Sequence, residues 1–180
     1  MYSLRRREER DLIDLFEIFH QPKCREALSG PDFETPEALS DSLAAFGPNR
    51  LELVICRRNS AVGYGGLFLC AGERRHTGWL SLFVHDAHQG LGLGDRLFAA
   101  LVAAADGLYG LRRLELVVRC DNPRAIEFYR RRGFRIEGRH VEFAMRAGGY
   151  VDVFTMSRLN ASAPAPARVE ADKVLEPTSA

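Results

Sequence analysis

A short glycine-rich segment is the part of this sequence best suited to holding a charged ligand. It runs from Gln89 to Gly94 with the letters QGLGLG, between an expected strand and a long expected helix. Glycines let the backbone approach a ligand closely and turn its N–H groups inward, and the start of a helix adds free N–H groups and a positive dipole end. The segment therefore predicts a phosphate cradle that needs no basic side chain, although glycines between a strand and a helix can also serve simply as a turn.

Two common phosphate-binding motifs do not fit this segment. The dinucleotide motif G-x-G-x-x-G needs a third glycine where this chain has Asp95, and it needs to follow the first strand of a βαβ unit. Here antiparallel strands are expected before the loop. A P-loop needs Gly-Lys followed by Ser or Thr, and the sequence has no such triplet. Both motifs are therefore excluded.

A second segment, from Asn122 to Phe134, has the pattern of a helix, and one of its residues has no structural explanation. Asn122 can cap the helix, Pro123 suits its first position, and Gly133 supplies the left-handed stop. These features explain a helix without any function. They do not explain Tyr129, which follows the core-facing Phe128 and is placed to look across the end of the preceding strand.

Together the two segments resemble the GCN5-related N-acetyltransferases, the GNAT family. The first segment matches that family's Q/R-x-x-G-x-G/A loop, and the second matches N-x-x-A-x-x-F-Y-x-x-x-G-F, in the same order. The resemblance covers Tyr2 to Leu159 and is strongest from Trp79 onward. Its ending, from Ile136 to Arg158, is similar to the bacterial L-amino-acid N-acetyltransferases.

The resemblance implies a fold in which a central pair of strands splays apart and acetyl-CoA lies in the gap. Backbone groups of Leu82, Phe83 and Val84 would contact the pantetheine and the thioester carbonyl, and one N–H would stabilise the developing oxyanion. Asn122 would contact the pantetheine arm, and Tyr129 would protonate the leaving thiolate or hydrogen-bond its sulfur. The pyrophosphate would be held by the loop residues Gln89, Gly90, Leu91, Gly92, Leu93, Gly94 and Asp95.

A base is also implied, because the amine that attacks is protonated at neutral pH. Several relatives carry a Glu five residues before the motif Asn, where this chain has Val117. Glu115, two residues earlier, should face the same side of its strand and is our predicted base. Two alternatives stay open. Glu115 could form an ion pair with Arg112 or Arg113, and water could carry the proton away.

The family analogy places the acceptor against the loop from Gln21 to Thr35 and the last hairpin, from His140 to Tyr150. An amino-acid carboxylate would need an arginine or backbone N–H groups, and Arg25, Arg139 and Arg146 are equal candidates. The predicted reaction moves an acetyl group from acetyl-CoA to the primary amine of a small molecule, an L-amino acid or analogue, by direct attack in a ternary complex. The alternatives are a protein N-terminal or polyamine acetyltransferase and a non-catalytic acyl-CoA-binding module.

Apolar periodicity predicts the elements that position these groups. Strands are expected over residues 2–7, 51–56, 62–70, 79–84, 114–118, 134–146 and 150–158. Helices are expected over 9–20, from 35 to the stop at 47, over 91–105 and over 123–132. The pattern favours an α/β fold of the α+β kind, a mixed, mostly antiparallel sheet of about seven strands flanked by about four helices.

The composition limits the partners. Residues 1–159 are expected to form the acetyltransferase domain, and the Ala- and Pro-rich residues 160–180 a disordered tail. The net charge of +1 gives no field that would hold nucleic acid or a membrane, and with no membrane span or secretory signal we expect a cytoplasmic protein. The cysteines and histidines lack metal-ligand spacing, so no metal is expected. A small-molecule amine is the expected partner, and the resemblance allows a homodimer.

Overall fold

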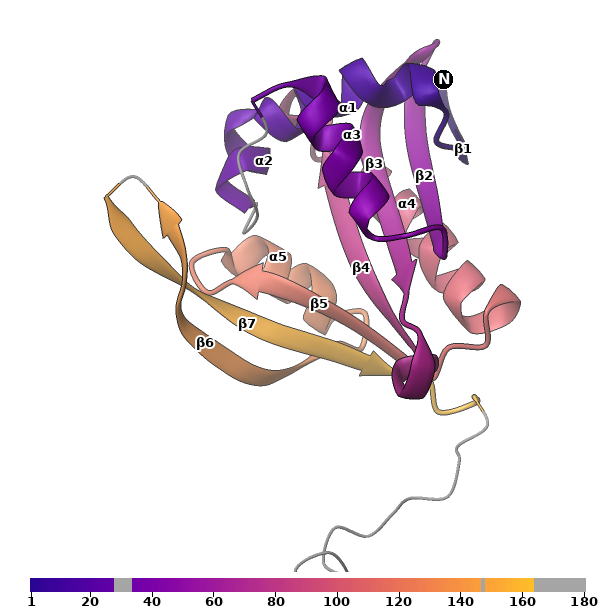
Figure 1. Ribbon diagram of the computed structural model, residues 1–180, viewed down its shortest axis with the longest axis vertical. Helices are drawn as coiled ribbons and strands as arrows, with labels where there is room; N and C mark the ends of the chain where they lie inside the picture. Colours follow the sequence, from indigo (N-terminus) through magenta and orange to yellow (C-terminus); the bar gives the residue numbers. More distant parts are fainter. Residues whose placement is uncertain (28–33, 147, 164–180) are drawn as a thin grey trace, which may run out of the picture.

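Seven strands form one sheet in the order β1-β2-β3-β4-β5-β7-β6 in the computed structural model (Figure 1). The structure describes residues 1–27, 34–146 and 148–163. Neighbouring strands run antiparallel except β4 and β5, which are parallel, so the predicted mixed, mostly antiparallel sheet is confirmed. In chain order the strands are β1 (Tyr2–Arg6), β2 (Arg50–Arg57), β3 (Ser60–Leu69), β4 (Thr77–Val84), β5 (Arg113–Arg119), β6 (Arg135–Arg146) and β7 (Gly149–Leu159).

The described residues form five α-helices, one more than the sequence predicted. The additional helix follows directly on the first, because Pro22 ends one helix and also suits the first position of the next. None of the helices in the described ranges has the length and apolar character of a membrane span. The helices are α1 (Leu12–His20), α2 (Pro22–Ala27), α3 (Pro36–Ala45), α4 (Leu93–Ala103) and α5 (Pro123–Arg130).

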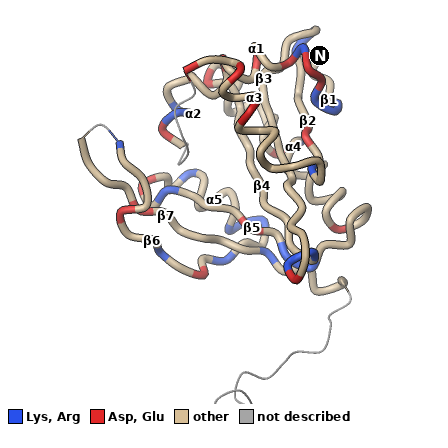
Figure 2. Tube along the Cα trace, in the orientation of Figure 1, with Lys and Arg blue, Asp and Glu red and all other residues tan. Residues whose placement is uncertain are grey.

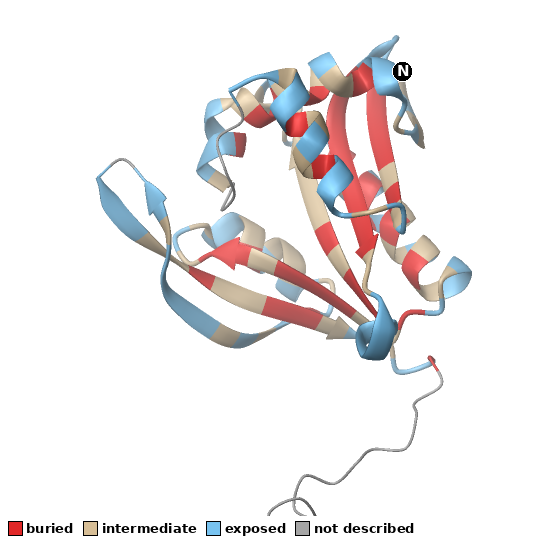
Figure 3. Cartoon of the chain, in the orientation of Figure 1, coloured by how far each residue is buried: buried red, intermediate tan, exposed pale blue. Residues whose placement is uncertain are grey.

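Two apolar cores lie on the two faces of the sheet. Leu97 of α4 packs in the core that includes Ile55, whereas Leu15 of α1 packs in the core that includes Val54. Val54 and Ile55 are neighbours in β2 and reach opposite cores because successive side chains of a strand point to opposite faces. β3 lies between the two layers of helices and is buried almost throughout (Figure 3).

β4 and β5 separate after three paired positions. The pairs are Thr77 with Arg113, Gly78 with Leu114, and Trp79 with Glu115. Beyond them β4 continues along β3 to Val84, and β5 continues along β7 to Arg119, so the two strands open into a V (Figure 1). At the joined end the packing is tight, because a Cβ on Gly78 would lie 2.7 Å from the Leu111 side chain. The splayed strand pair that the resemblance implied is therefore present.

The chain stays against the domain for four residues after β7. The N–H of Asn160 donates to the carbonyl of Arg112 at 2.9 Å. The Arg112 guanidinium donates in turn to the carbonyls of Asn160 and Ala163, and Ala163 is buried. Most of the predicted tail, residues 164–180, lies outside the described residues.

Candidate active site

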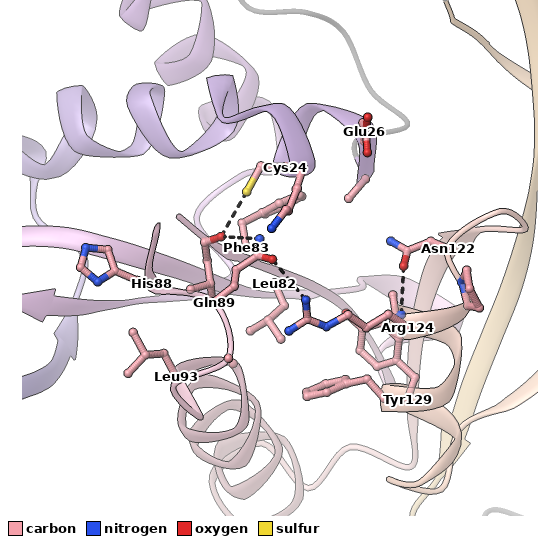
Figure 4. A pocket seen from close by; sticks show the side chains of 18 of the residues that line it. Cys24, Glu26, Leu82, Phe83, His88, Gln89, Leu93, Asn122, Arg124 and Tyr129 are labelled. Atoms are coloured by element: carbon pink, nitrogen blue, oxygen red, sulfur yellow. Dashed lines mark hydrogen bonds between the residues drawn. The ribbon is translucent and has the colours of Figure 1, made fainter. Parts of the chain in front are cut away.

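The V between β4 and β5 opens into a cavity of about 490 Å³ (Figure 4). Eleven of the twelve residues predicted to hold the cofactor line it, and Leu91, whose side chain is exposed, does not. The lining residues come from α2, the end of β4, the loop before α4 and the start of α4, the connection from β5 to α5 and α5 itself, and the end of β6. They are Lys23, Cys24, Glu26, Ala27, Leu82, Phe83, Val84, His88, Gln89, Gly90, Gly92, Leu93, Gly94, Asp95, Asp121, Asn122, Pro123, Arg124, Ala125, Phe128, Tyr129 and Arg146.

The glycine loop has the backbone conformation that the sequence pattern indicated. Gly90 and Gly92 have φ angles of +80° and +73°, in the left-handed region that favours glycine. A Cβ on either residue would meet nothing within 4 Å, so conformation rather than crowding explains the glycines. Gly92 is the N-cap of α4, and no side chain caps this end. The first N–H groups of α4 are therefore available to an anion.

The one acidic residue of this loop is compensated by a basic one. The Asp95 carboxylate forms an ion pair with Arg132, which comes from the turn after α5. The Arg132 guanidinium carbon lies 3.6 Å from the centroid of the Phe128 ring, so the aromatic face holds this side chain in place. The pair neutralises the Asp95 carboxylate at the end of the cavity where the free N–H groups lie.

The Gln89 side chain ties the loop to its surroundings. Its amide nitrogen donates to the carbonyl of Val84 at 3.1 Å and to a carboxylate oxygen of Asp86 at 3.2 Å. Its amide oxygen accepts a long hydrogen bond, 3.5 Å, from Arg124 of α5. Figure 4 shows Gln89 and Arg124 reaching toward one another across the opening. Gln89 thus fixes the shape of the loop and leaves the loop's backbone for a ligand.

The two sides of the V present different groups to the cavity. On the β4 side, Leu82, Phe83 and Val84 pair with β3 along one edge, while the other edge faces the gap that β5 has left. On the α5 side, the Asn122 side-chain oxygen accepts from the N–H of Ala125 at 3.0 Å, which confirms the predicted cap. The amide nitrogen of Asn122 is then the group left for a ligand.

Tyr129 lies on α5 with its ring packed and its hydroxyl unengaged. The ring centroid is 5.2 Å from that of Phe128 and 5.6 Å from that of Phe134. Burial raises the pKa of the Tyr129 phenol to about 12, so the hydroxyl is protonated at neutral pH. No residue in the described ranges makes a hydrogen bond with this hydroxyl, although Tyr129 lines the cavity. Its O–H is therefore free to donate to a ligand.

The structure places Glu115 outside the cavity, where the predicted base would have to lie. Glu115 pairs with Trp79 at the joined end of the V and does not line the cavity. It is buried, and its carboxylate accepts from the guanidinium groups of Arg74 and Arg113. Basic and acidic positions gather at this end of the V (Figure 2). Of the alternatives left open, the structure agrees with the ion pair between Glu115 and Arg113.

The segment from Gln21 to Thr35 was expected to face the acceptor as a loop, but its first part is the helix α2, which forms a wall of the cavity. Lys23, Cys24, Glu26 and Ala27 all line the cavity from this helix. The Cys24 thiol donates to the carbonyl of Val84 at 3.3 Å, and burial raises its pKa to about 12. It is thus a thiol rather than a nucleophilic thiolate at neutral pH. The signal that could have found α2 is Pro22 itself, which is favoured at the first position of a helix.

Of the three arginines considered for an acceptor carboxylate, Arg146 is the one in the cavity lining, as far as the described residues show. It lies at the end of β6 and forms ion pairs with Glu26 at 3.1 Å and with Asp121 at 3.7 Å. Arg139, on the same strand, instead pairs with Asp152 and is exposed. The acceptor side of the cavity therefore has side chains of both signs.

Comparisons with known proteins agree with this geometry. The Acetyltransferase (GNAT) family model matches residues 12–134. An L-amino acid N-acetyltransferase of Escherichia coli (strain K12) is 30% identical over 162 residues, which cover 87% of this chain and 96% of that protein. A Salmonella typhimurium protein solved with its cofactor acetyl-CoA has a TM-score of 0.74 at 21% identity, covering 95% of this chain and 99% of the other. A Vibrio cholerae spermidine N-acetyltransferase in complex with CoA and spermine has a TM-score of 0.76 at 21% identity, covering 88% and 95%. Since the family model spans more than half of the sequence, this chain belongs to the GNAT family of acetyltransferases.

Proposed function

We propose that this acetyltransferase moves the acetyl group of acetyl-CoA to the primary amine of an L-amino acid or a close analogue. The observation that carries the proposal is the V itself: it has an uncapped helix start at its donor end and the unengaged Tyr129 hydroxyl beside its gap. Membership of the family gives the reaction type. The relative named for L-amino acids supports the acceptor class, because it matches nearly the whole domain.

The residues present fit acetyl-CoA, which supplies a thioester carbonyl open to attack. The left-handed glycines and the first N–H groups of α4 suit its pyrophosphate. No side chain caps the start of α4, so these N–H groups are free to donate to an anion. The free edge of β4 from Leu82 to Val84 suits the amide-rich pantetheine arm, and one of its N–H groups would stabilise negative charge on the carbonyl oxygen. The amide nitrogen of Asn122 donates from the opposite side.

The proton balance assigns Tyr129 as the acid. The amine nitrogen bonds to the acetyl carbon, the carbon–sulfur bond breaks, and the thiolate takes a proton from the Tyr129 hydroxyl. The acceptor ammonium gives up two protons in all. One passes to water before the attack and leaves with the solvent, and the second, lost after the attack, passes through water and restores the phenol. We assign this route to water because the carboxylates that line the cavity in the described ranges are paired, Glu26 and Asp121 with Arg146, and Asp95 with Arg132. Holding amine and thioester together can supply roughly 7–11 kcal/mol of the barrier.

The charge pattern of the cavity favours an amino acid over a polyamine. A polyamine carries several positive charges and needs acidic groups that are not already neutralised. Among the described residues, the acidic groups that line the cavity are each matched by an arginine. An amino acid, which carries one charge of each sign, fits such a lining better.

The test is a thiol-release assay with acetyl-CoA and a panel of L-amino acids, polyamines and a peptide with a free N-terminus. We expect turnover with amino acids, with the N-acetyl product identified by mass spectrometry. Turnover confined to polyamines or to the peptide would contradict the acceptor class. Acetyl-CoA binding with no turnover of any amine would favour a non-catalytic module.

A further inference from the structure

We propose that Arg146 binds the carboxylate of the acceptor and that Glu26 receives its ammonium group, so that an α-amino acid replaces the Arg146–Glu26 ion pair. The inference rests on the proposed function and adds to it the residues that choose the acceptor. An α-amino acid has a carboxylate and an ammonium group on one carbon, as close together as the charges of an ion pair. A pair of opposite side chains that lines the cavity therefore has the matching pattern.

Arg146 meets its two partners with different nitrogens. Nη2 lies 3.1 Å from Glu26 of α2, and Nη1 lies 3.7 Å from Asp121, which follows β5. A guanidinium has five N–H donors in one plane, so these two contacts leave donors for a further carboxylate. The Arg146 side chain is 40% exposed and the Glu26 side chain 60%, so both can be reached by a small molecule.

Asp121 is fixed by a second arginine and serves to position Arg146. Two nitrogens of the Arg119 guanidinium donate to the two carboxylate oxygens of Asp121, one of them at 2.9 Å. The Arg119 side chain is only 3% exposed, so this pair is anchored in the sheet. The hydrogen bonds from Arg119 hold the pKa of Asp121 below its usual value, which keeps the carboxylate charged toward Arg146. Because Arg119 balances Asp121, Glu26 is the partner that an acceptor can displace.

The other basic residues of the cavity belong to its donor end. Arg124 donates to Gln89 of the glycine loop. The backbone of Lys23 also lies at this end, because its N–H donates to Asp86 beside that loop at 3.0 Å. Arg146 instead stands where the end of the β6–β7 hairpin approaches α2, on the far side of the V from α4 (Figure 1). The geometry therefore assigns Arg146, rather than Lys23 or Arg124, to the acceptor.

The experiment compares an L-amino acid with its carboxamide, which keeps the amine and loses the carboxylate. With acetyl-CoA saturating, the unmodified enzyme should prefer the acid. Arg146→Gln should lower kcat/KM for the acid roughly 10- to 100-fold, the value of a hydrogen-bonded charge pair, and leave the carboxamide within about two-fold. Glu26→Gln should lower both acceptors alike, since both carry the ammonium group. The KM for acetyl-CoA should not move in either variant.

Arg139→Gln is the matched control, because it removes an exposed arginine of the same strand that lies outside the cavity lining. It should change neither acceptor. Equal loss of acid and carboxamide in Arg146→Gln would mean that Arg146 only holds α2 in place, and would overturn the inference. Equal turnover of acid and carboxamide by the unmodified enzyme would overturn it without any variant, should Arg146→Gln not fold. Turnover of neither by the unmodified enzyme would instead reject the proposed function.

Discussion

The donor and acceptor ends of the cavity are built in different ways. At the donor end one continuous segment, Gln89 to Asp95, presents backbone N–H groups, and its side chains mainly hold the loop in shape. At the acceptor end the groups are side chains from three distant segments, and they include Glu26, Asp121 and Arg146. Backbone groups suit a ligand that stays the same, whereas side chains can be exchanged without rebuilding the fold. We infer that the first end sets the donor and the second sets the acceptor.

The largest effect should come from breaking the donor end at Gly92. Gly92→Val forces a β-branched residue into a left-handed φ of +73°, which shifts the loop and the first N–H groups of α4. We expect acetyl-CoA affinity to fall by roughly 100-fold or more, about 2.7 kcal/mol, as measured by calorimetry. Normal binding would mean that the cradle is not where the pyrophosphate lies.

Gly47→Val is the matched control for backbone strain. Gly47 has a φ of +75°, has open space around its missing side chain, and lies outside the cavity lining. The Gly47→Val variant should lose stability to the same extent as Gly92→Val, but its affinity for acetyl-CoA should be unchanged. A similar loss of affinity in both variants would show general destabilisation rather than damage to the site.

The same contrast explains what the sequence could predict. The shape of the donor end depends on local features, namely the glycines and the strand-to-helix turn, so the pattern from Gln89 to Gly94 was sufficient to predict the conformation of this loop. The acceptor end depends on contacts between distant segments, and nothing in the spacing of Glu26 and Arg146 indicates that they meet. Glu115 was misjudged for a related reason. Alternation along a strand gives the side a residue faces, but it does not give the point at which β4 and β5 part.

A smaller effect should follow from removing the Tyr129 hydroxyl, which lies between the two ends. Tyr129→Phe keeps the ring packed against Phe128 and removes the proposed acid. We expect kcat to fall by roughly 10- to 100-fold while the affinities of both substrates stay the same. The control is Tyr109→Phe, whose ring packs against the core outside the cavity lining. If kcat is unchanged in Tyr129→Phe, then Tyr129 is not the acid.

The pH profile of kcat/KM should distinguish the titration of the acceptor amine from that of Tyr129, the proposed acid. Below the pKa of the amine, kcat/KM should rise roughly ten-fold per pH unit, because only the uncharged amine attacks. Tyr129 works in its protonated form, and with a pKa of about 12 it keeps its proton through pH 10. The profile should therefore show no fall between pH 9 and 10. A bell-shaped profile with a falling limb near pH 8 would show that another group is the acid.

The smallest effect should come from the residues after β7, of which the described ones, 160–163, do not line the cavity. We propose that the catalytic domain is complete at Ala163, because Arg112 holds the carbonyls of Asn160 and Ala163. A chain ending at Ala163 should keep full turnover and the same Tm. A chain ending at Leu159 loses those hydrogen bonds and should be about 1–2 kcal/mol less stable, a fall in Tm of roughly 2–8 °C, with turnover at 25 °C unchanged. Lost turnover in the chain ending at Ala163 would show that residues 164–180 take part in catalysis, and would contradict the division of the cavity into two self-sufficient ends.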